Sequence, residues 1–174
     1  TLPDNEADDR FYSHALIQPL ESEVLADAIT DVLDIPEQYG DEAIGTRAVT
    51  LFDSKIPSES LDILGRCDRE DTCESVVSSS GGLPQMLHMF NGGLINARIS
   101  DPNGRLAKLI ASGQSPDAII DAMYQRALSR RPSQQEREFW SRHLASTTDA
   151  GPLRAILEDI VWSLVTCREF GTNH

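Results

Sequence analysis

The most informative segment of the chain spans residues 152–167 and reads PLRAILEDIVWSLVTC. Apolar side chains recur in it at the three- and four-residue spacing of an α-helix, in a stripe wide enough for an element with core on more than one side. The stripe consists of Ile156, Leu157, Ile160, Val161, Leu164 and Val165. The sequence therefore predicts a central helix that begins near Leu153, with Leu157, Ile160 and Leu164 among the most buried residues.

Two helices with clear start signals precede this segment. Residues 115–117, Ser-Pro-Asp, combine an N-cap, a proline suited to the first helical position and an acid that complements the helix dipole. Ser133 and Glu136 match a capping box directly after Pro132. We expect the helix that follows this box to direct four side chains inward, those of Phe139, Trp140, His143 and Leu144.

The first half of the chain carries shorter helix signals between loops. Helices are predicted over 22–33, 58–64, 83–95 and 105–112, with Ser22 available to cap the first and Gly65 ending the second. The β-branched residues within 47–52 favour a short extended segment, and residues 66–82 read as a polar loop. The fold class is therefore all-α: a single compact helical domain of about five to seven helices with a loop-rich N-terminal half.

Composition excludes several kinds of partner. The 174 residues include 28 acidic and 15 basic side chains, a formal net charge of −13, so we expect no binding of nucleic acid, which attracts positive surfaces. No apolar run approaches the roughly 20 residues of a spanning helix, and we expect no membrane insertion. Residues 1–21, acidic and poor in apolar side chains at their start, are predicted to be a flexible arm or the tail of a preceding segment, and residues 22–174 the helical domain.

The cysteines suggest one local cross-link. Cys67 and Cys73 bracket five residues, a separation that fits a loop-closing disulfide but none of the usual zinc or haem-attachment patterns; free thiols and metal ligation remain alternatives. Cys167 lies on the apolar side of the last helix and is predicted to be a small buried hydrophobe. The acids beside the pair form a possible ligand or cation loop: Asp68, Glu70, Asp71 and Glu74. They lack the order and the glycine of an EF-hand, so a solvated loop with local ion pairs is the favoured interpretation.

No catalytic constellation is visible in the sequence. The chain has no nucleophile elbow, no His-Glu-x-x-His, no phosphate loop and no dinucleotide fingerprint, and its four histidines lie far apart. We therefore assign no catalytic residue, no metal ligand and no cofactor. Four aromatic side chains offer a sugar-stacking platform, although their helical spacing is more typical of a core: Tyr124, Phe139, Trp140 and Trp162.

Seven short stretches, taken in order, carry a resemblance to a known family. They are Ser22–Ile29, Gly45–Val49, Leu64–Glu74, Leu87–Gly92, Asp101–Ala107, Ala127–Pro132 and Arg168–His174. From about Ser22 onward the chain resembles the C-terminal part of the domain of unknown function fifteen-fifty-three, found in planctomycetes and their relatives. The resemblance depends on the ordered series, because no single stretch is decisive.

The resemblance implies a setting and no activity. Members of that family are usually large exported proteins that accompany sulfatases and polysaccharide breakdown, often with a cytochrome c-like domain at the front. An exported location, in the periplasm or at the cell surface, favours a disulfide between Cys67 and Cys73. It also implies that the protein continues upstream of Thr1. The expected partners are other domains of the same protein, polysaccharide, or a cytochrome c-like domain.

Three hypotheses for the function follow. The leading one is a non-catalytic helical module of an exported multidomain protein linked to polysaccharide use, acting in assembly or glycan contact. The second is part of an enzyme, redox-linked or glycan-active, whose active site an upstream domain completes. The third is a structural component of the cell surface.

Overall fold

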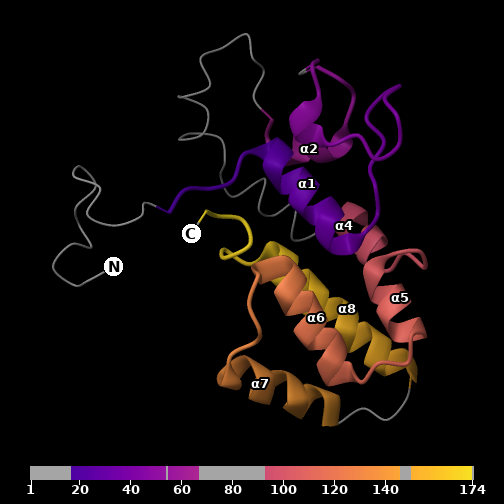
Figure 1. Ribbon diagram of the computed structural model, residues 1–174, viewed down its shortest axis with the longest axis vertical. Helices are drawn as coiled ribbons and strands as arrows, with labels where there is room; N and C mark the ends of the chain where they lie inside the picture. The colour runs from indigo at the N-terminus through magenta and orange to yellow at the C-terminus, as the bar shows by residue number, and fades with distance from the viewer. Residues whose placement is uncertain (1–16, 54, 67–92, 146–149, 174) are drawn as a thin grey trace, which may run out of the picture.

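The computed structural model describes residues 17–53, 55–66, 93–145 and 150–173. Within them the chain forms seven α-helices and one short 3₁₀ helix (Figure 1). The helices are α1 (Ser22–Leu33), η1 (Ala48–Thr50, the 3₁₀ helix), α2 (Glu59–Leu64), α4 (Gly93–Ile99), α5 (Arg105–Ala111), α6 (Pro116–Leu128), α7 (Gln134–Ala145) and α8 (Ala150–Thr166). The β-type pairing in this part of the chain is a single isolated bridge between Pro19 and Thr172. The predicted all-α class is confirmed.

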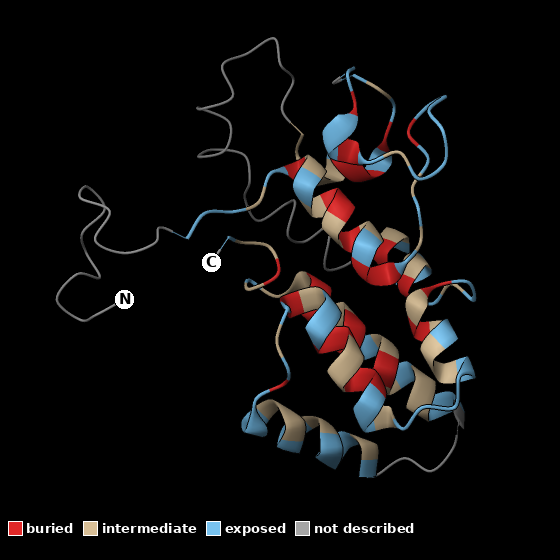
Figure 2. Ribbon diagram, in the orientation of Figure 1, coloured by how far each residue is buried: buried red, intermediate tan, exposed pale blue. Residues whose placement is uncertain are grey.

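The main core lies around α8, as the sequence predicted. Helices α6 and α8 run side by side, and α4 and α7 also pack against α8 (Figure 1). Leu157, Ile160 and Leu164 are 2%, 1% and 4% exposed, within one apolar cluster that also draws residues from α1, α4, α5 and α6. Figure 2 shows buried segments on several of these helices. The predicted central helix is therefore confirmed.

A second, smaller core lies on the other side of α1. It contains Ala26, Tyr39, Ala48, Leu51 and Leu61, which come from α1, η1, α2 and the loops between them. Helix α1 thus serves two cores, because Ile29, Val32 and Leu33 face the main cluster. The loop-rich first half folds over α1 in this way.

Two helix starts follow the capping signals read from the sequence, and a third cap, at Ser58, was not predicted. The hydroxyls of Ser58 and Ser115 accept hydrogen bonds from backbone N–H groups three residues on, at 3.2 and 3.3 Å. In the capping box, Ser133 donates its backbone N–H to Glu136 at 2.7 Å, and Glu136 returns the bond to the Ser133 hydroxyl at 3.3 Å. The predicted cap at Ser22 is wrong, since Glu21 occupies the N-cap position and the Ser22 hydroxyl donates to Glu23 instead.

The predicted extended segment at 47–52 is also wrong. Residues 48–50 form the 3₁₀ helix η1, because the buried carboxylate of Asp27 accepts hydrogen bonds from the backbone N–H groups of Ala48 and Val49, at 2.7 and 3.3 Å. A carboxylate that accepts the first N–H groups of a helical turn stabilises that turn over an extended chain. Asp27, which lies in α1 and 21 residues before Ala48, therefore favours the 3₁₀ turn over an extended segment.

Helix α7 differs most from the expectation. Among the four side chains predicted to face inward, Trp140 and Leu144 are half-buried against the main core, whereas Phe139 is 43% exposed and His143 is exposed. No residue of α7 is fully buried, and Figure 2 shows the helix as a peripheral element with exposed and intermediate positions. Of the four side chains, Trp140 and Leu144 make the contact with the main core. The spacing of the four residues in the sequence did not indicate this difference.

Other predicted segments are only partly covered by the described residues. Residues 83–92 of the predicted 83–95 helix lie outside them, and α4 begins at Gly93. The arm predicted for residues 1–21 lies outside them up to residue 16, whereas residues 18–20 pair with residues 171–173. Among the helices described here, none is long and apolar enough to cross a membrane.

Candidate functional site

The site residues proposed from the sequence lie outside the described part of the chain. This applies to Cys67 and Cys73 and to the possible cation loop of Asp68, Glu70, Asp71 and Glu74, so the disulfide and the loop stay predictions. Cys167 is described: it follows α8, is half-buried against the main core and lies 3.1 Å from the Leu164 carbonyl oxygen. Among described residues, no group of three or more His, Cys, Asp or Glu side chains could hold a metal ion.

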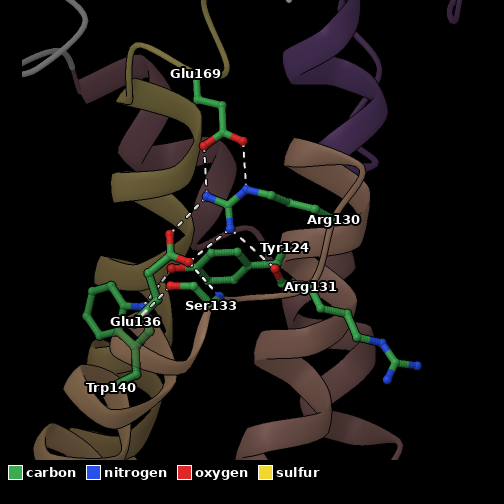
Figure 3. Close-up of polar contacts among 7 residues, drawn as sticks. All are labelled: Tyr124, Arg130, Arg131, Ser133, Glu136, Trp140 and Glu169. Carbon is green, nitrogen blue, oxygen red and sulfur yellow. Dashed lines mark hydrogen bonds and ion pairs between the residues drawn. The ribbon is translucent and has the colours of Figure 1, made fainter. Parts of the chain in front are cut away.

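Among the described residues, the structure brings charged side chains together in several places, two of which we name. The first, which we call the Arg130 cluster, joins α6, α7 and the segment after α8; it consists of Tyr124, Arg130, Arg131, Ser133, Glu136, Trp140 and Glu169 (Figure 3). The second, the Arg98 cluster, lies between α1, α2 and α4; it consists of Thr30, Ile35, Glu37, Tyr39, Ser58, Ser60 and Arg98.

Arg130 holds two carboxylates at once. Its Nε and one terminal nitrogen donate to the two oxygens of Glu169 at 2.7 and 2.8 Å, and both terminal nitrogens donate to Glu136 at 2.9 Å. The remaining N–H donates to the Arg131 carbonyl oxygen at 3.2 Å. A guanidinium has five N–H groups, so every donor of Arg130 has a partner. Figure 3 shows the guanidinium lying between the two carboxylates.

Local structure explains why these groups meet. Helix α6 ends with Ser129 in the left-handed conformation, at φ 55°, which turns the chain before Arg130. The capping box then fixes Glu136 at the start of α7, with its carboxylate held by the Ser133 backbone N–H. Beneath the guanidinium, the Tyr124 ring lies 5.6 Å away, a distance at which a cation is attracted to the ring face.

The electrostatics of the Arg130 cluster follow from this geometry. The hydrogen bond from Arg130 lowers the pKa of Glu136 to about 2, with a further contribution from the Ser133 backbone N–H. The hydrogen bonds to Glu169 and Glu136 raise the pKa of Arg130. Below the ion pairs, the Trp140 indole N–H donates to the Tyr124 hydroxyl at 2.9 Å, and burial is the main cause that raises the pKa of this tyrosine. Arg130 and Glu136 therefore form an ionised pair at neutral pH.

The Arg98 cluster is better shielded from solvent. The side chains of Arg98 and Glu37 are 12% and 17% exposed and lie 3.4 Å apart. Arg98 also donates to the Thr30 hydroxyl at 2.8 Å and to the Ile35 carbonyl oxygen at 2.6 Å. The other oxygen of Glu37 accepts hydrogen bonds from the hydroxyls of Ser58 and Ser60. This cluster connects α4 and α2 to the loop that follows α1.

Tyr39 is the one member of the Arg98 cluster whose polar atom has no partner. The side chain is 1% exposed, and its hydroxyl makes no hydrogen bond to any residue that the structure describes. Burial, followed by the nearby charge of Glu37, raises its pKa to about 12. A neutral phenol is therefore retained, and its ring fills the small core beside α1.

More basic side chains gather at the C-terminal end of α1. Arg105 donates to the carbonyl oxygens of Val32 and Asp31 at 2.9 and 3.0 Å, and Arg126 donates to Asp31 at 3.1 Å. Lys108 lies 2.6 Å from the Asp34 carboxylate and, through that hydrogen bond, lowers its pKa. The last carbonyls of a helix attract cations, so these basic groups from α5 and α6 stabilise the end of α1, although Lys108 and Arg126 remain exposed.

The four aromatic residues considered as a sugar-stacking platform do not form one surface. Tyr124 is buried, while Trp140 and Trp162 are half-buried against the main core. Phe139 is the exposed member, and its ring lies 4.4 Å from that of His143. The core interpretation is therefore correct for three of the four residues.

Comparisons of the chain with protein-family models, with curated proteins and with solved structures found no match. The resemblance to the planctomycete-type domain therefore stays a prediction.

Sequence reasoning found only part of these clusters. It identified Ser133 and Glu136 as a capping box, and it placed Arg130 in one of the seven stretches without giving it a role. Glu37 and Arg98 carried no signal, and Glu169 lies in the last of the seven stretches without a role, because their partners lie 61 and 39 residues away along the chain. The run Arg130-Arg131-Pro132, directly before a capping box, was the sequence signal that could have indicated an ion pair between Arg130 and Glu136.

Proposed function

We propose that the chain is a non-catalytic helical module of an exported multidomain protein linked to polysaccharide use, acting in assembly or glycan contact. The observation that carries the non-catalytic part is the complete use of Arg130: all five of its N–H groups bind protein oxygens. An arginine that binds substrate or stabilises a transition state must offer donors to the reacting molecule. Here the donors hold helices together.

The other charged groups support the same conclusion. Arg98, Arg105 and Arg126 donate to backbone carbonyl oxygens at the end of α1. Several basic side chains thus bind groups of the fold itself, while many carboxylates stay exposed on a chain of net charge −13. A surface of this kind favours a partner domain that presents basic residues, and it repels anionic polymers.

The charge also selects between glycans. Sulfated chains carry negative charge and would approach a protein of the same sign, so a neutral polysaccharide is the expected glycan ligand. Phe139 and His143 supply an exposed aromatic pair against which the apolar face of a sugar ring can pack. We therefore propose the outer face of α7 as the surface for glycan contact.

The test is a panel of neutral and sulfated polysaccharides, measured for binding and for release of reducing ends. We expect no release by this chain, and any binding should favour neutral glycans and weaken in Phe139→Ala. The matched control is Phe52→Ala. Phe52 is also an exposed aromatic residue, but it follows η1 and is not part of α7. Release of reducing ends by the chain alone would overturn the proposal. If the chain binds no glycan of the panel, glycan contact is excluded for that panel and assembly is the remaining role. That role is measured as binding to the neighbouring domains of the full protein.

A further inference from the structure

Arg130 connects three segments that are otherwise held by separate contacts. It follows α6, it binds Glu136 in the first turn of α7, and it binds Glu169 in the segment after α8 (Figure 3). Both carboxylates approach the same guanidinium, and one terminal nitrogen donates to each of them. A single conformation of the Arg130 side chain therefore forms the hydrogen bonds to both carboxylates.

The segment after α8 is itself joined to the start of the described fold. Leu20 donates its N–H to the Gly171 carbonyl oxygen at 2.9 Å, and Asn173 donates to that of Gln18 at 2.9 Å. In Figure 1 the indigo segment that precedes α1 accordingly lies near the yellow segment that follows α8. Glu169 thus links Arg130 to the pairing of residues 18–20 with 171–173, which we call the terminal pairing.

Helix α7 depends on polar contacts more than the other long helices do. It has no fully buried residue, and its described ties to α6 are the ion pair between Arg137 and Asp121 at 3.0 Å and the hydrogen bond from Trp140 to Tyr124. Segments with little buried apolar surface open at low free-energy cost. Helix α7 is therefore expected to detach locally while α8 stays folded.

We propose that Arg130 is a shared latch that couples the docking of α7 to the terminal pairing. Holding the Arg130 side chain in one rotamer costs conformational entropy. When both carboxylates bind, they share this cost, and when one leaves, the bonds to the other must offset it alone. Each docked segment thus lowers the cost of docking the other, which is positive coupling. Such coupling is reciprocal, so loosening α7 loosens the terminal pairing and the converse. A partner that contacts residues 18–20 changes the docking of α7 through this latch.

Hydrogen–deuterium exchange of the full chain, measured by peptide, tests the coupling. In Glu169→Gln, exchange in α7 should accelerate, and in Glu136→Gln exchange in residues 18–20 and 171–173 should accelerate, each by about fivefold, the low end for coupled sites. Glutamine keeps the capping-box acceptor at position 136, so α7 retains its start signal. Arg130→Lys should accelerate both regions, because an ammonium cannot serve two bidentate carboxylates.

The control variant is Arg137→Gln, which weakens α7 through its ion pair with Asp121 and leaves Arg130 unchanged. It should accelerate exchange in α7 and affect the terminal pairing much less than Glu136→Gln does, because the bonds of Arg130 to both carboxylates remain. The amides of α8 serve as the reference for global unfolding and should change little in any variant. The proposal is overturned if Glu136→Gln and Glu169→Gln each affect only their own segment. It is equally overturned if Arg137→Gln loosens the terminal pairing as much as Glu136→Gln does.

Discussion

Replacing Arg98 by Met should destabilise the protein strongly. Methionine fills a similar volume without a charge, so the substitution removes the three hydrogen bonds to Thr30, Ile35 and Glu37 while keeping most of the packing. Glu37 then remains as a carboxylate with a 17% exposed side chain and no cation beside it. The perturbation therefore tests whether the Arg98 cluster holds α4 and α2 to α1.

The magnitude follows from burial. Breaking a buried ion pair by removing one partner costs about 3–5 kcal/mol, because the other charge is left unpaired. Since both side chains of this pair retain some exposure, we expect the lower end, about 3 kcal/mol. In Arg98→Met/Glu37→Gln the leftover charge is absent and the acceptor for the Ser58 and Ser60 hydroxyls is kept, so the loss should shrink by about 1–2 kcal/mol.

Urea unfolding followed by circular dichroism at 222 nm measures these free energies. The matched control is Arg154→Met, which breaks an ion pair with Glu158 whose side chains are 42% and 28% exposed. Exposed pairs of this type contribute about 0–1 kcal/mol. The reasoning is refuted if Arg98→Met costs no more than Arg154→Met, or if the double variant is less stable than Arg98→Met alone.

Three other outcomes are expected. Ile160→Ala should lower the free energy of unfolding by about 2–5 kcal/mol, because the side chain is 1% exposed in the main core; a loss under about 1 kcal/mol in urea titrations would place it at the periphery. Glu136, whose pKa in the folded protein is about 2 against an ordinary 4.5, contributes stability that is fully present above pH 4.5 and is lost as the pH falls toward 2; a Glu136→Gln variant should therefore show a weaker acid-induced loss in thermal unfolding curves, and an unchanged profile would contradict the ion pair with Arg130. Alkylation of the denatured, non-reduced protein followed by mass spectrometry should label one thiol, that of Cys167, if Cys67 and Cys73 are paired; three labelled thiols would exclude the bridge.

Local signals in the sequence determined the helices. The stripe that includes Leu157, Ile160 and Leu164 predicted the buried face of α8, since residues three and four apart share a helix face in any surroundings. The caps at Ser115 and Ser133 were correct for a similar reason, because donor and acceptor are three residues apart.

Only the tertiary structure decided which charged side chains meet. The bonds of Asp27 to Ala48, Arg98 to Glu37 and Arg130 to Glu169 span 21, 61 and 39 residues. Each depends on the path of the chain between its partners, which no local pattern specifies, and the first of them converted a predicted extended segment into η1.

The same physical reason explains α7. Its sequence specified a helix and a capping box, but the side chains that face the core depend on how the helix lies against α6 and α8. That docking is set by Arg130, Arg137 and Trp140, whose partners come from other elements. Hydrogen bonds within a helix are local and can be read from sequence, whereas the contacts that orient a polar, peripheral helix form only after the rest of the chain has folded.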